Sequence, residues 1–295
     1  MDYIYHIVLL IGIFIIAAVS LGIINGAAGQ LSLGHAGFWA VGAYSGAAYA
    51  VYGALPVPDF VNLFISCVIG ALTAGLAGLV IGIPCLRLRG DYLAIATLGF
   101  GEIIRIVIMN MDVVGGASGF TNIPKWSNFL WVYTWVVLII LFNVNLLGGT
   151  HGRAIISIRE DEIAAESMGI NTFKYKTLAF VLGAMGAGIS GALFAHLQQL
   201  LHPNGFTFLW SVVFLLMIIL GGLGSITGAV VGAIILGALP EVLRNISETV
   251  SEWRMVIYSV LLIVLMLSSP KGIFGKHELN LKKLFRMLFK KGANS

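Results

Sequence analysis

The chain has 295 residues, of which 59% are hydrophobic and only 10% are charged, and its mean hydropathy is +0.98. A soluble domain carries about 25% charged residues. With so few charges this chain cannot build a water-facing surface over most of its length, which argues against a soluble enzyme or a nucleic-acid-binding protein. Lipid must be the solvent for most of it.

The charges are also unevenly placed. No Asp, Glu, Lys or Arg lies between Asp2 and Asp59, or within residues 177–240. A bilayer core needs roughly 20 apolar residues per helix, so each tract can hold two or three crossings. The 37 glycines agree with this interpretation, because helices in lipid pack closely through small residues. The sequence therefore predicts an all-α, polytopic integral membrane protein.

The start of the chain is expected to be a first span rather than a cleavable signal peptide. It has no positively charged segment, and its apolar run 4–24 is long enough to cross a bilayer. Cys67 and Cys85 lie in or beside apolar runs, so they are expected to be small buried thiols. The six histidines are scattered without metal-ligand spacing, and no metal site is expected.

Breaks at charges, prolines and glycine clusters predict about nine transmembrane helices, with a range of roughly eight to ten. The predicted spans are 4–26, 31–52, 62–86, 92–111, 127–148, 177–200, 206–223, 226–241 and 255–269. Two glycine-rich segments, 29–37 and 221–228, could instead be broken or re-entrant.

The orientation follows from the distribution of Lys and Arg over the loops. With a cytoplasmic C-terminus, one side carries thirteen of them: Arg87, Arg89, Arg153, Arg159, Lys174, Lys176, Lys271, Lys276, Lys282, Lys283, Arg286, Lys290 and Lys291. The other side carries three: Lys125, Arg244 and Arg254. This asymmetry predicts an N-terminus outside the cell, as an odd number of spans requires, and it accounts for the net charge of +4. The basic amphipathic tail 276–295 is expected to attach to anionic headgroups.

The longest cytoplasmic loop, residues 151–176, has a charged and helix-forming middle. Gly169 is expected to end a short helix there, and Asn171 with Thr172 to begin the next. Apolar Ile155, Ile158, Ile163 and Met168 leave a mixed surface for a partner. The loop could be a lever that a soluble domain grips, or an ordinary solvated loop.

Three polar clusters are candidates for a translocation path. Gln30, Ser32 and His35 lie among glycines, where a helix can unwind and expose backbone groups to a polar cavity. The alternative is a plain contact between helices that the glycines permit.

The other two clusters lie in and after the fourth predicted span. Glu102 and Arg105 are three residues apart on one helix face and are predicted to pair. Charges within a span are costly, which makes them functional candidates, although a purely structural pair or a contact with a partner permease explains them equally. Ser118, in a glycine-rich stretch on the outer side, belongs to a flexible gate or to a simple loop.

Five stretches of this sequence resemble branched-chain amino acid permeases of the LivM type, a family of ABC importer subunits. They are residues 29–42 (GQLSLGHAGFWAVG), 90–106 (GDYLAIATLGFGEIIRI), 115–122 (GGASGFTN), 157–171 (SIREDEIAAESMGIN) and 269–275 (SPKGIFG). The fourth stretch is similar to the EAA-type coupling loop, with Ile163 in place of its Glu and without the downstream Ile-x-Leu-Pro. In the last, Ser269 replaces the family's Arg.

The resemblance implies a permease domain over residues 1–275, with a coupling helix in the loop 151–176. It implies that Arg159, Glu162, Ala164, Ala165, Glu166 and Gly169 couple the chain to ATPases. The expected partners are a second homologous permease, two ATPases that use ATP and Mg, and a periplasmic or lipid-anchored substrate-binding protein, at the bacterial inner membrane. The chain has no G-x-x-x-x-G-K-[ST] motif and is expected to be neither an enzyme nor a cofactor-binding subunit.

Other functions remain as alternatives. Permeases for urea or short amides resemble the same family, and apolar spans would look much alike for either substrate. An ion-coupled secondary transporter should carry ionisable residues in several spans, whereas only Glu102 and Arg105 qualify here. A membrane-embedded enzyme would need a nucleophile–base or metal constellation that the sequence does not show.

Overall fold

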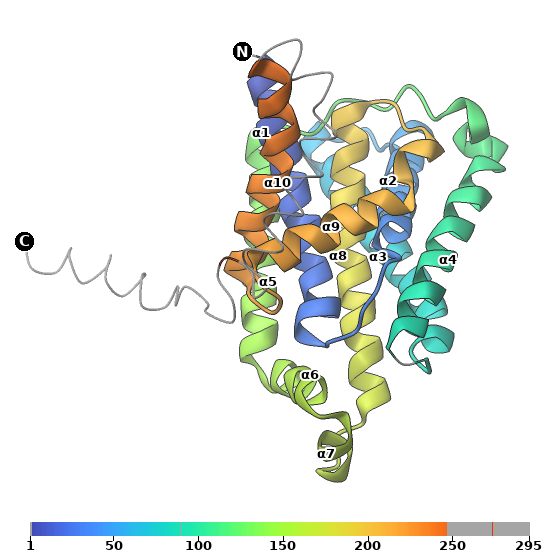
Figure 1. Ribbon diagram of the computed structural model, residues 1–295. Helices are drawn as coiled ribbons and strands as arrows, with labels where there is room; N and C mark the ends of the chain where they lie inside the picture. Colours follow the sequence, from blue (N-terminus) through green and yellow to red (C-terminus); the bar gives the residue numbers. More distant parts are fainter. Residues whose placement is uncertain (1, 89, 247–272, 274–295) are drawn as a thin grey trace, which may run out of the picture.

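The long helix α8 (Thr172–Gln198) lies at the centre of the molecule, and helices α1, α2 and α3 pack against it. The computed structural model describes residues 2–88, 90–246 and 273 (Figure 1). Around α8 stand α1 (Asp2–Leu21), α2 (His35–Tyr52), α3 (Asp59–Cys85), α4 (Asp91–Met109), α5 (Phe129–Gly148), α9 (Phe208–Gly221) and α10 (Ile226–Ile246). Two short helices, α6 (Thr150–Glu160) and α7 (Glu162–Ser167), extend from one end of this bundle.

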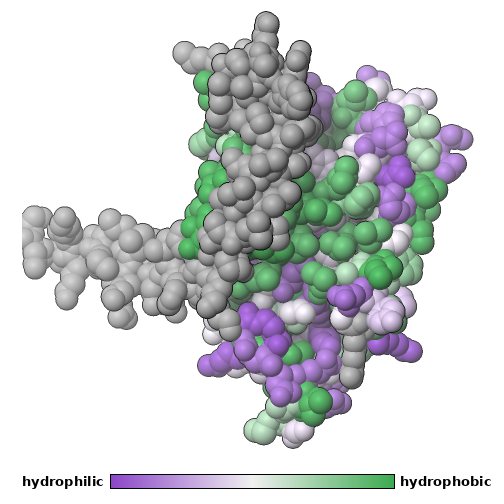
Figure 2. All heavy atoms as spheres, viewed as in Figure 1, coloured by the Kyte–Doolittle hydropathy of each residue, from purple (hydrophilic) through white to green (hydrophobic). Residues whose placement is uncertain are grey.

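The described residues contain six helices that are long and apolar enough to cross a membrane. They are Tyr3–Ala27, Asp59–Cys85, Asp91–Met109, Phe129–Gly148, Thr172–Gln198 and Pro203–Gly221, and Ile226–Pro240 is a shorter apolar helix. Helix α2 is rich in glycine and alanine and largely buried. Hydrophobic residues cover the middle of the face in Figure 2, and hydrophilic ones gather at the end that carries α6. The prediction of an all-α, polytopic membrane protein is confirmed.

The first eight predicted spans correspond to α1–α5 and α8–α10, with shifted boundaries. Helix α2 begins at His35 rather than at residue 31, because the preceding segment is unwound. Helix α8 begins at Thr172 rather than at residue 177, so its first turns belong to the predicted loop. The predicted ninth span 255–269 and the tail 276–295 lie outside the described residues.

Helix α1 does not run directly into α2. It continues as a π-helical segment, η1 (Gly22–Ala27), and the chain is then unwound over residues 28–34. Gly29 has a φ of +66°, which side chains other than glycine rarely adopt. The predicted break at the first glycine-rich segment is therefore present. The second is present between α9 and α10, where Gly222 and Gly224 have φ values of +115° and +93°.

Glycines allow helices α2, α3 and α8 to approach until their backbones are in contact. A Cβ added to Gly70 of α3 would lie 2.9 Å from the Gly188 carbonyl oxygen of α8, and one added to Gly42 of α2 would meet Gly188 still more closely. Helices in lipid gain stability from such close packing, because hydrophobic burial drives little association there. The centre of the bundle thus depends on residues that have no side chain.

We predict that Gly188→Ala destabilises the protein. The added methyl group would meet the backbone of α3, which cannot move aside without separating the helices, and overpacking of this kind costs about 1–3 kcal/mol. Thermal unfolding in detergent should show a lower midpoint. Gly99→Ala is the matched control, since no atom lies within 4 Å of a Cβ built there. Equal midpoints for the two variants would contradict the proposed packing.

Candidate functional site

The predicted coupling loop forms two helices rather than one. Asp161, with φ −157° and ψ 110°, separates α6 from α7. Its Oδ1 accepts a hydrogen bond of 3.0 Å from the backbone N–H of Ala164, which caps the N-terminus of α7. The expected single helix is therefore wrong, and the reason is local: an Asp in the middle of the segment is a better cap than a helix interior residue.

The far end of α7 agrees with the sequence prediction. Gly169 has a φ of +84° and follows the last turn of α7, and the backbone N–H of Ile170 returns to the Ala165 carbonyl at 3.1 Å. Two residues later, Asn171 Oδ1 accepts from the N–H of Lys174 at 2.9 Å and caps α8. Both predicted caps are confirmed, and they join α7 to the central helix through a short, hydrogen-bonded turn.

Helix α7 exposes apolar side chains at the end of the molecule. Ile163 and Met168 are 76% and 83% exposed, and Ala164 and Glu166 are exposed beside them. Ala165, in contrast, is only 5% exposed. Ala165, which the resemblance assigns to ATPase coupling, therefore turns toward the rest of the chain, whereas Ala164 faces outward.

An ion pair fixes α7 against the first turn of α8. Glu162 Oε1 lies 2.6 Å from Lys176 Nζ, and both side chains are at least two-thirds buried. Glu162, one of the predicted coupling residues, thus holds α7 to this chain. A displacement of α7 must therefore act on α8 directly.

Helix α6 packs beneath η1. Ile155 is 1% exposed and lies in an apolar cluster with Ile23, Ala27 and Ala179. Ile158 is 5% exposed, so the expectation that these two isoleucines belong to the partner surface is wrong. At the end of α6, Arg159 Nη1 donates a 2.8 Å hydrogen bond to the Gly26 carbonyl oxygen, and Nη2 pairs with Glu160. Arg159 therefore points into the molecule rather than out toward a partner.

The unwound segment 28–34 is tied into the interior. Ser32 exchanges hydrogen bonds of 3.3 Å with the Asn25 side chain, and His35 Nε2 lies 3.1 Å from the Ala17 carbonyl. Gln30 is 4% exposed, and neither polar atom of its side chain has a partner among the described residues. Gln30, Ser32 and His35 are all buried. Buried polar groups normally find partners, so Gln30 is the unusual member of this cluster.

Two residues that the sequence did not single out support this segment. Thr97 Oγ1 of α4 accepts from the Leu33 N–H at 3.0 Å, and Ser211 Oγ of α9 accepts from the Ala36 N–H at 2.8 Å. The sequence offers one indication of these two residues: each is a small hydroxyl residue within an apolar span. The indication is weak, because many such hydroxyl groups bond to the backbone of their own helix.

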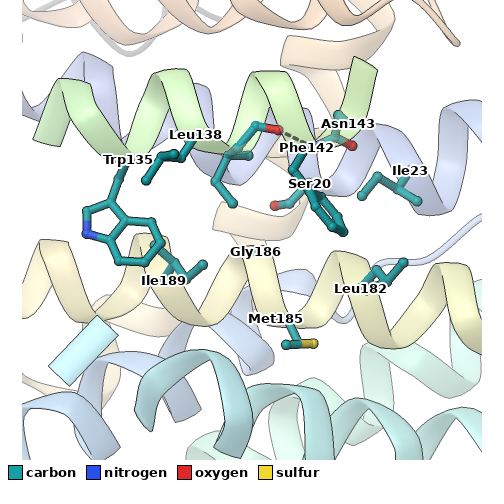
Figure 3. Close-up of a pocket in the computed structure, with 11 residues that line it drawn as sticks. Ser20, Ile23, Trp135, Leu138, Phe142, Asn143, Leu182, Met185, Gly186 and Ile189 are labelled. Carbon is teal, nitrogen blue, oxygen red and sulfur yellow. Dashed lines mark hydrogen bonds between the residues drawn. The ribbon is translucent and has the colours of Figure 1, made fainter. Parts of the chain in front are cut away.

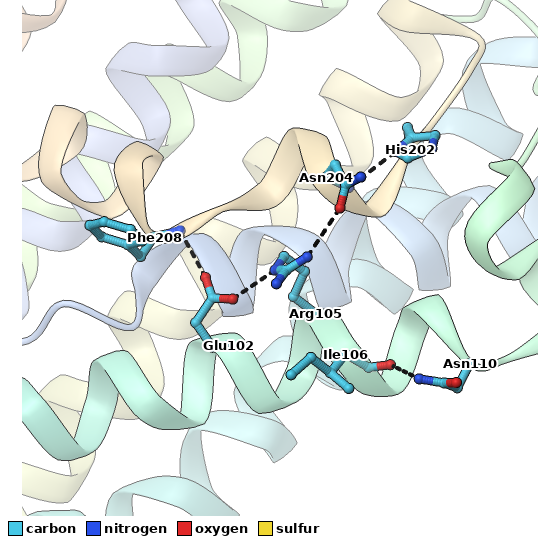
Figure 4. A network of polar contacts seen from close by, with 7 residues as sticks. All are labelled: Glu102, Arg105, Ile106, Asn110, His202, Asn204 and Phe208. Carbon is cyan, nitrogen blue, oxygen red and sulfur yellow. Dashed lines mark hydrogen bonds and ion pairs between the residues drawn. The ribbon is translucent and has the colours of Figure 1, made fainter.

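Glu102 and Arg105 pair as predicted and also reach α9 (Figure 4). Arg105 Nε donates to Glu102 Oε2 at 2.7 Å, and its Nη1 donates to Asn204 Oδ1 at 3.1 Å. Glu102 Oε1 accepts from the N–H of Phe208, the first residue of α9, at 3.1 Å. A carboxylate at a helix N-terminus satisfies a free N–H and interacts favourably with the helix dipole.

The predicted path residues do not form one site. Ser118 is exposed in the loop that follows α4, and that loop is held by paired hydrogen bonds between Phe120 and Leu201. Glu102 and Arg105 lie within α4, and the segment that contains Gln30, Ser32 and His35 is next to Arg159 of α6. The candidates are spread over three levels of the molecule.

An apolar cavity of about 350 Å³ lies between α1, α5 and α8 (Figure 3). Its walls include Trp135, Leu138 and Phe142 of α5, with Leu182 and Ile189 of α8. The described residues contain no group of three His, Cys, Asp or Glu that could hold a metal ion.

Comparisons with known proteins agree on one family. The family described as "Branched-chain amino acid transport system / permease component" matches residues 3–266. The high-affinity branched-chain amino acid transport system permease protein LivM of Escherichia coli (strain K12) is 36% identical over 92% of this chain and 69% of its own length. LivM of Salmonella typhimurium is 35% identical over the same shares. E. coli LivH is 32% identical over 56% of this chain and 53% of its own length.

No solved structure matches the chain. The sequence match nevertheless extends over nearly all of the described bundle, including α6 and α7. The chain belongs to the family of permease components of branched-chain amino acid transport systems.

Proposed function

We propose that this chain is a transmembrane subunit of an ABC importer that carries leucine, isoleucine and valine across the bacterial inner membrane. ATP is hydrolysed, with Mg, on two separate ATPase subunits. A second, homologous permease completes the membrane part, and a substrate-binding protein delivers the amino acid from outside. The names of the LivM and LivH relatives support the substrate and the presence of two kinds of permease.

The observation that carries the proposal is the position of α7. It protrudes from the end of the bundle, exposes Ile163 and Met168, and is fastened to α8 by the Glu162–Lys176 ion pair. Exposed apolar side chains on a short rigid helix suit a protein contact. An ATPase that grips α7 can therefore move α8, which lies at the centre of the bundle.

The same arrangement supports an orientation. Thirteen of the seventeen Lys and Arg residues would share the cytoplasmic side with α7, and the N-terminus and Ser118 would lie outside. Substrate would then meet Ser118 first, the level of Glu102 and Arg105 next, and the segment of Gln30, Ser32 and His35 last. Unwound backbone at that last level can serve a polar substrate where a helix cannot.

Cysteine labelling tests the orientation. Cys67 and Cys85 are buried, so the native protein should give little background. In sealed cells, a membrane-impermeant maleimide should label Ser118→Cys and leave Ser167→Cys unlabelled until the membrane is opened. Both side chains are exposed, so access to the reagent is the main difference between them. Labelling of Ser167→Cys in sealed cells would show that the orientation is wrong.

Substitution of Ile163 tests the contact with the ATPases. Ile163→Asp places a charge in the proposed apolar contact, and we expect the ATPases to be lost on purification and leucine uptake to fall at least tenfold. Leu88→Asp is the matched control. Leu88 is an exposed apolar residue that follows α3, apart from α7, and its substitution should keep the ATPases bound.

Retention of the ATPases and of uptake in Ile163→Asp would contradict the coupling role of α7. Transport of urea in place of leucine by the reconstituted importer would leave the coupling intact and overturn the proposed substrate.

A double-mutant cycle tests whether Glu102 and Arg105 support each other. Each single change to Ala leaves a charge without its partner inside a span, whereas the double change removes both charges. We expect the loss in unfolding free energy to be non-additive by about 0.5–3 kcal/mol. The control cycle combines Glu102→Ala with Asn110→Ala. Asn110 caps the C-terminus of the same helix and lies outside the pair, so this cycle should be additive. Additivity in both cycles would exclude the mutual support.

A further inference from the structure

The two breaks in the helical structure meet each other. Gly26, in the π-helical segment that ends α1, lies against Gly224, in the turn between α9 and α10. A Cβ added to Gly26 would come within 2.8 Å of the Gly224 backbone nitrogen. The breaks belong to segments about 200 residues apart in the sequence, so this contact joins the start of the bundle to its last described helices.

The side chain of Arg159 occupies the place where the breaks meet. A Cβ on Gly29 would lie 2.7 Å from Arg159 Cγ, and a Cβ on Gly224 would lie 2.7 Å from Arg159 Nη1. The same Nη1 donates to the Gly26 carbonyl oxygen at 2.8 Å. One side chain from α6 therefore touches both breaks, its aliphatic part against the first and its guanidinium against both.

The charge of Arg159 is balanced at the surface. Nη2 and Nε both donate to Glu160 Oε1, at 2.5 Å and 3.2 Å, and Glu160 is the more exposed partner of the pair, 56% against 24%. One edge of the guanidinium thus faces the Glu160 carboxylate, and the other edge lies between the two breaks. Only a planar group with several N–H donors can do both.

A cavity of about 380 Å³ begins beside this contact and separates the first break from α9. Its walls are Asn25, Gly26, Gly29, Leu31, Leu215, Ile219, Leu223 and Arg159. The first break is therefore joined to the turn after α9 where Arg159 lies, and the cavity separates it from α9 itself. A movement of Arg159 would therefore change the width of this opening.

We propose that Arg159 is a positioning residue that moves the two breaks together when α6 is displaced, and that this movement opens and closes the cytoplasmic end of the path. The inference rests on the proposed function, in which an ATPase grips α7. Helix α6 is joined to α7 at Asp161 and packs against it, so we expect a displacement of α7 to reach α6 as well. It differs from a role for Arg159 in binding the ATPase, because the side chain is turned away from the exposed surface of α7.

The test uses the complete importer, with both permeases, the ATPases and the binding protein, in proteoliposomes. In Arg159→Met we expect the ATPases to remain bound and to hydrolyse ATP, while leucine uptake per ATP falls at least tenfold. Arg159→Lys should recover part of the uptake, since an ammonium can still reach the Gly26 carbonyl. Arg153→Met is the control: Arg153 lies on the same helix, is exposed, and should be replaceable without effect.

A second readout follows the breaks themselves. Leu31 and Leu223 line opposite sides of the cavity and are 40% and 47% exposed, so cysteines there can carry spin labels. In the native importer the distance between the labels should change when vanadate traps the ATPases. In Arg159→Met this change should be lost. A purely structural role for Arg159 would leave the nucleotide-dependent change in place.

The outcomes separate this inference from the proposed function. Normal uptake per ATP in an assembled Arg159→Met importer overturns the positioning role. Retention of the ATPases by Ile163→Asp overturns the coupling role of α7 instead. If Arg159→Met does not assemble, Arg159→Lys and Gly224→Ala decide. Hydrolysis with reduced uptake in both supports the proposal, and normal coupling in both overturns it.

Discussion

Close approach of helix backbones is the constraint on which the rest of this structure depends. Moving an apolar side chain from lipid into a protein interior contributes little free energy. Helices in a membrane must therefore associate through close van der Waals packing. Glycines at the crossings of α2, α3 and α8 allow that contact. Large side chains are kept for the space around the crossing, where Trp39 packs with Phe194, Phe206 and Phe214.

Irregular backbone in such a bundle creates a second requirement, because a buried N–H or C=O without a partner is costly where water is absent. The segment between η1 and α2 meets it by borrowing hydroxyl and amide groups from Asn25, Thr97 and Ser211, which lie on three different elements. The surrounding helices thus hold the break after α1 through these hydrogen bonds. A change in the positions of those helices would therefore change the conformation of the break.

Several features could be predicted from the sequence because their causes are local. The scarcity of charge predicts the membrane class, the spacing of Glu102 and Arg105 predicts their pairing, and Gly169 with Asn171 predicts the ends of α7 and α8. The pairing and the helix ends depend on residues within a few positions of one another, and the membrane class depends on composition alone.

The remaining features depend on contacts between distant parts of the chain. The burial of Ala165 and the inward direction of Arg159 follow from how α6 and α7 dock onto η1 and α8, and no spacing within residues 151–176 contains that information. The support that Ser211 gives to Ala36 spans 175 positions. The division of the loop 151–176 at Asp161 was open to prediction, since an Asp three residues before a free N–H is a common capping arrangement.

Helix α8 has a mechanical consequence of its own. It runs without a proline or a break for 27 residues, or about 40 Å, from the turn at Asn171 to Gln199, just before Leu201 pairs with Phe120 of the loop after α4. A rod of this kind transmits force in both directions. Linkage between two binding events is reciprocal, so a protein that docks on the outer loop would alter the affinity at α7 as much as an ATPase alters the outer loop. In the proposed importer, the same helix would transmit the occupancy of the outer surface to the ATPases before any substrate has crossed.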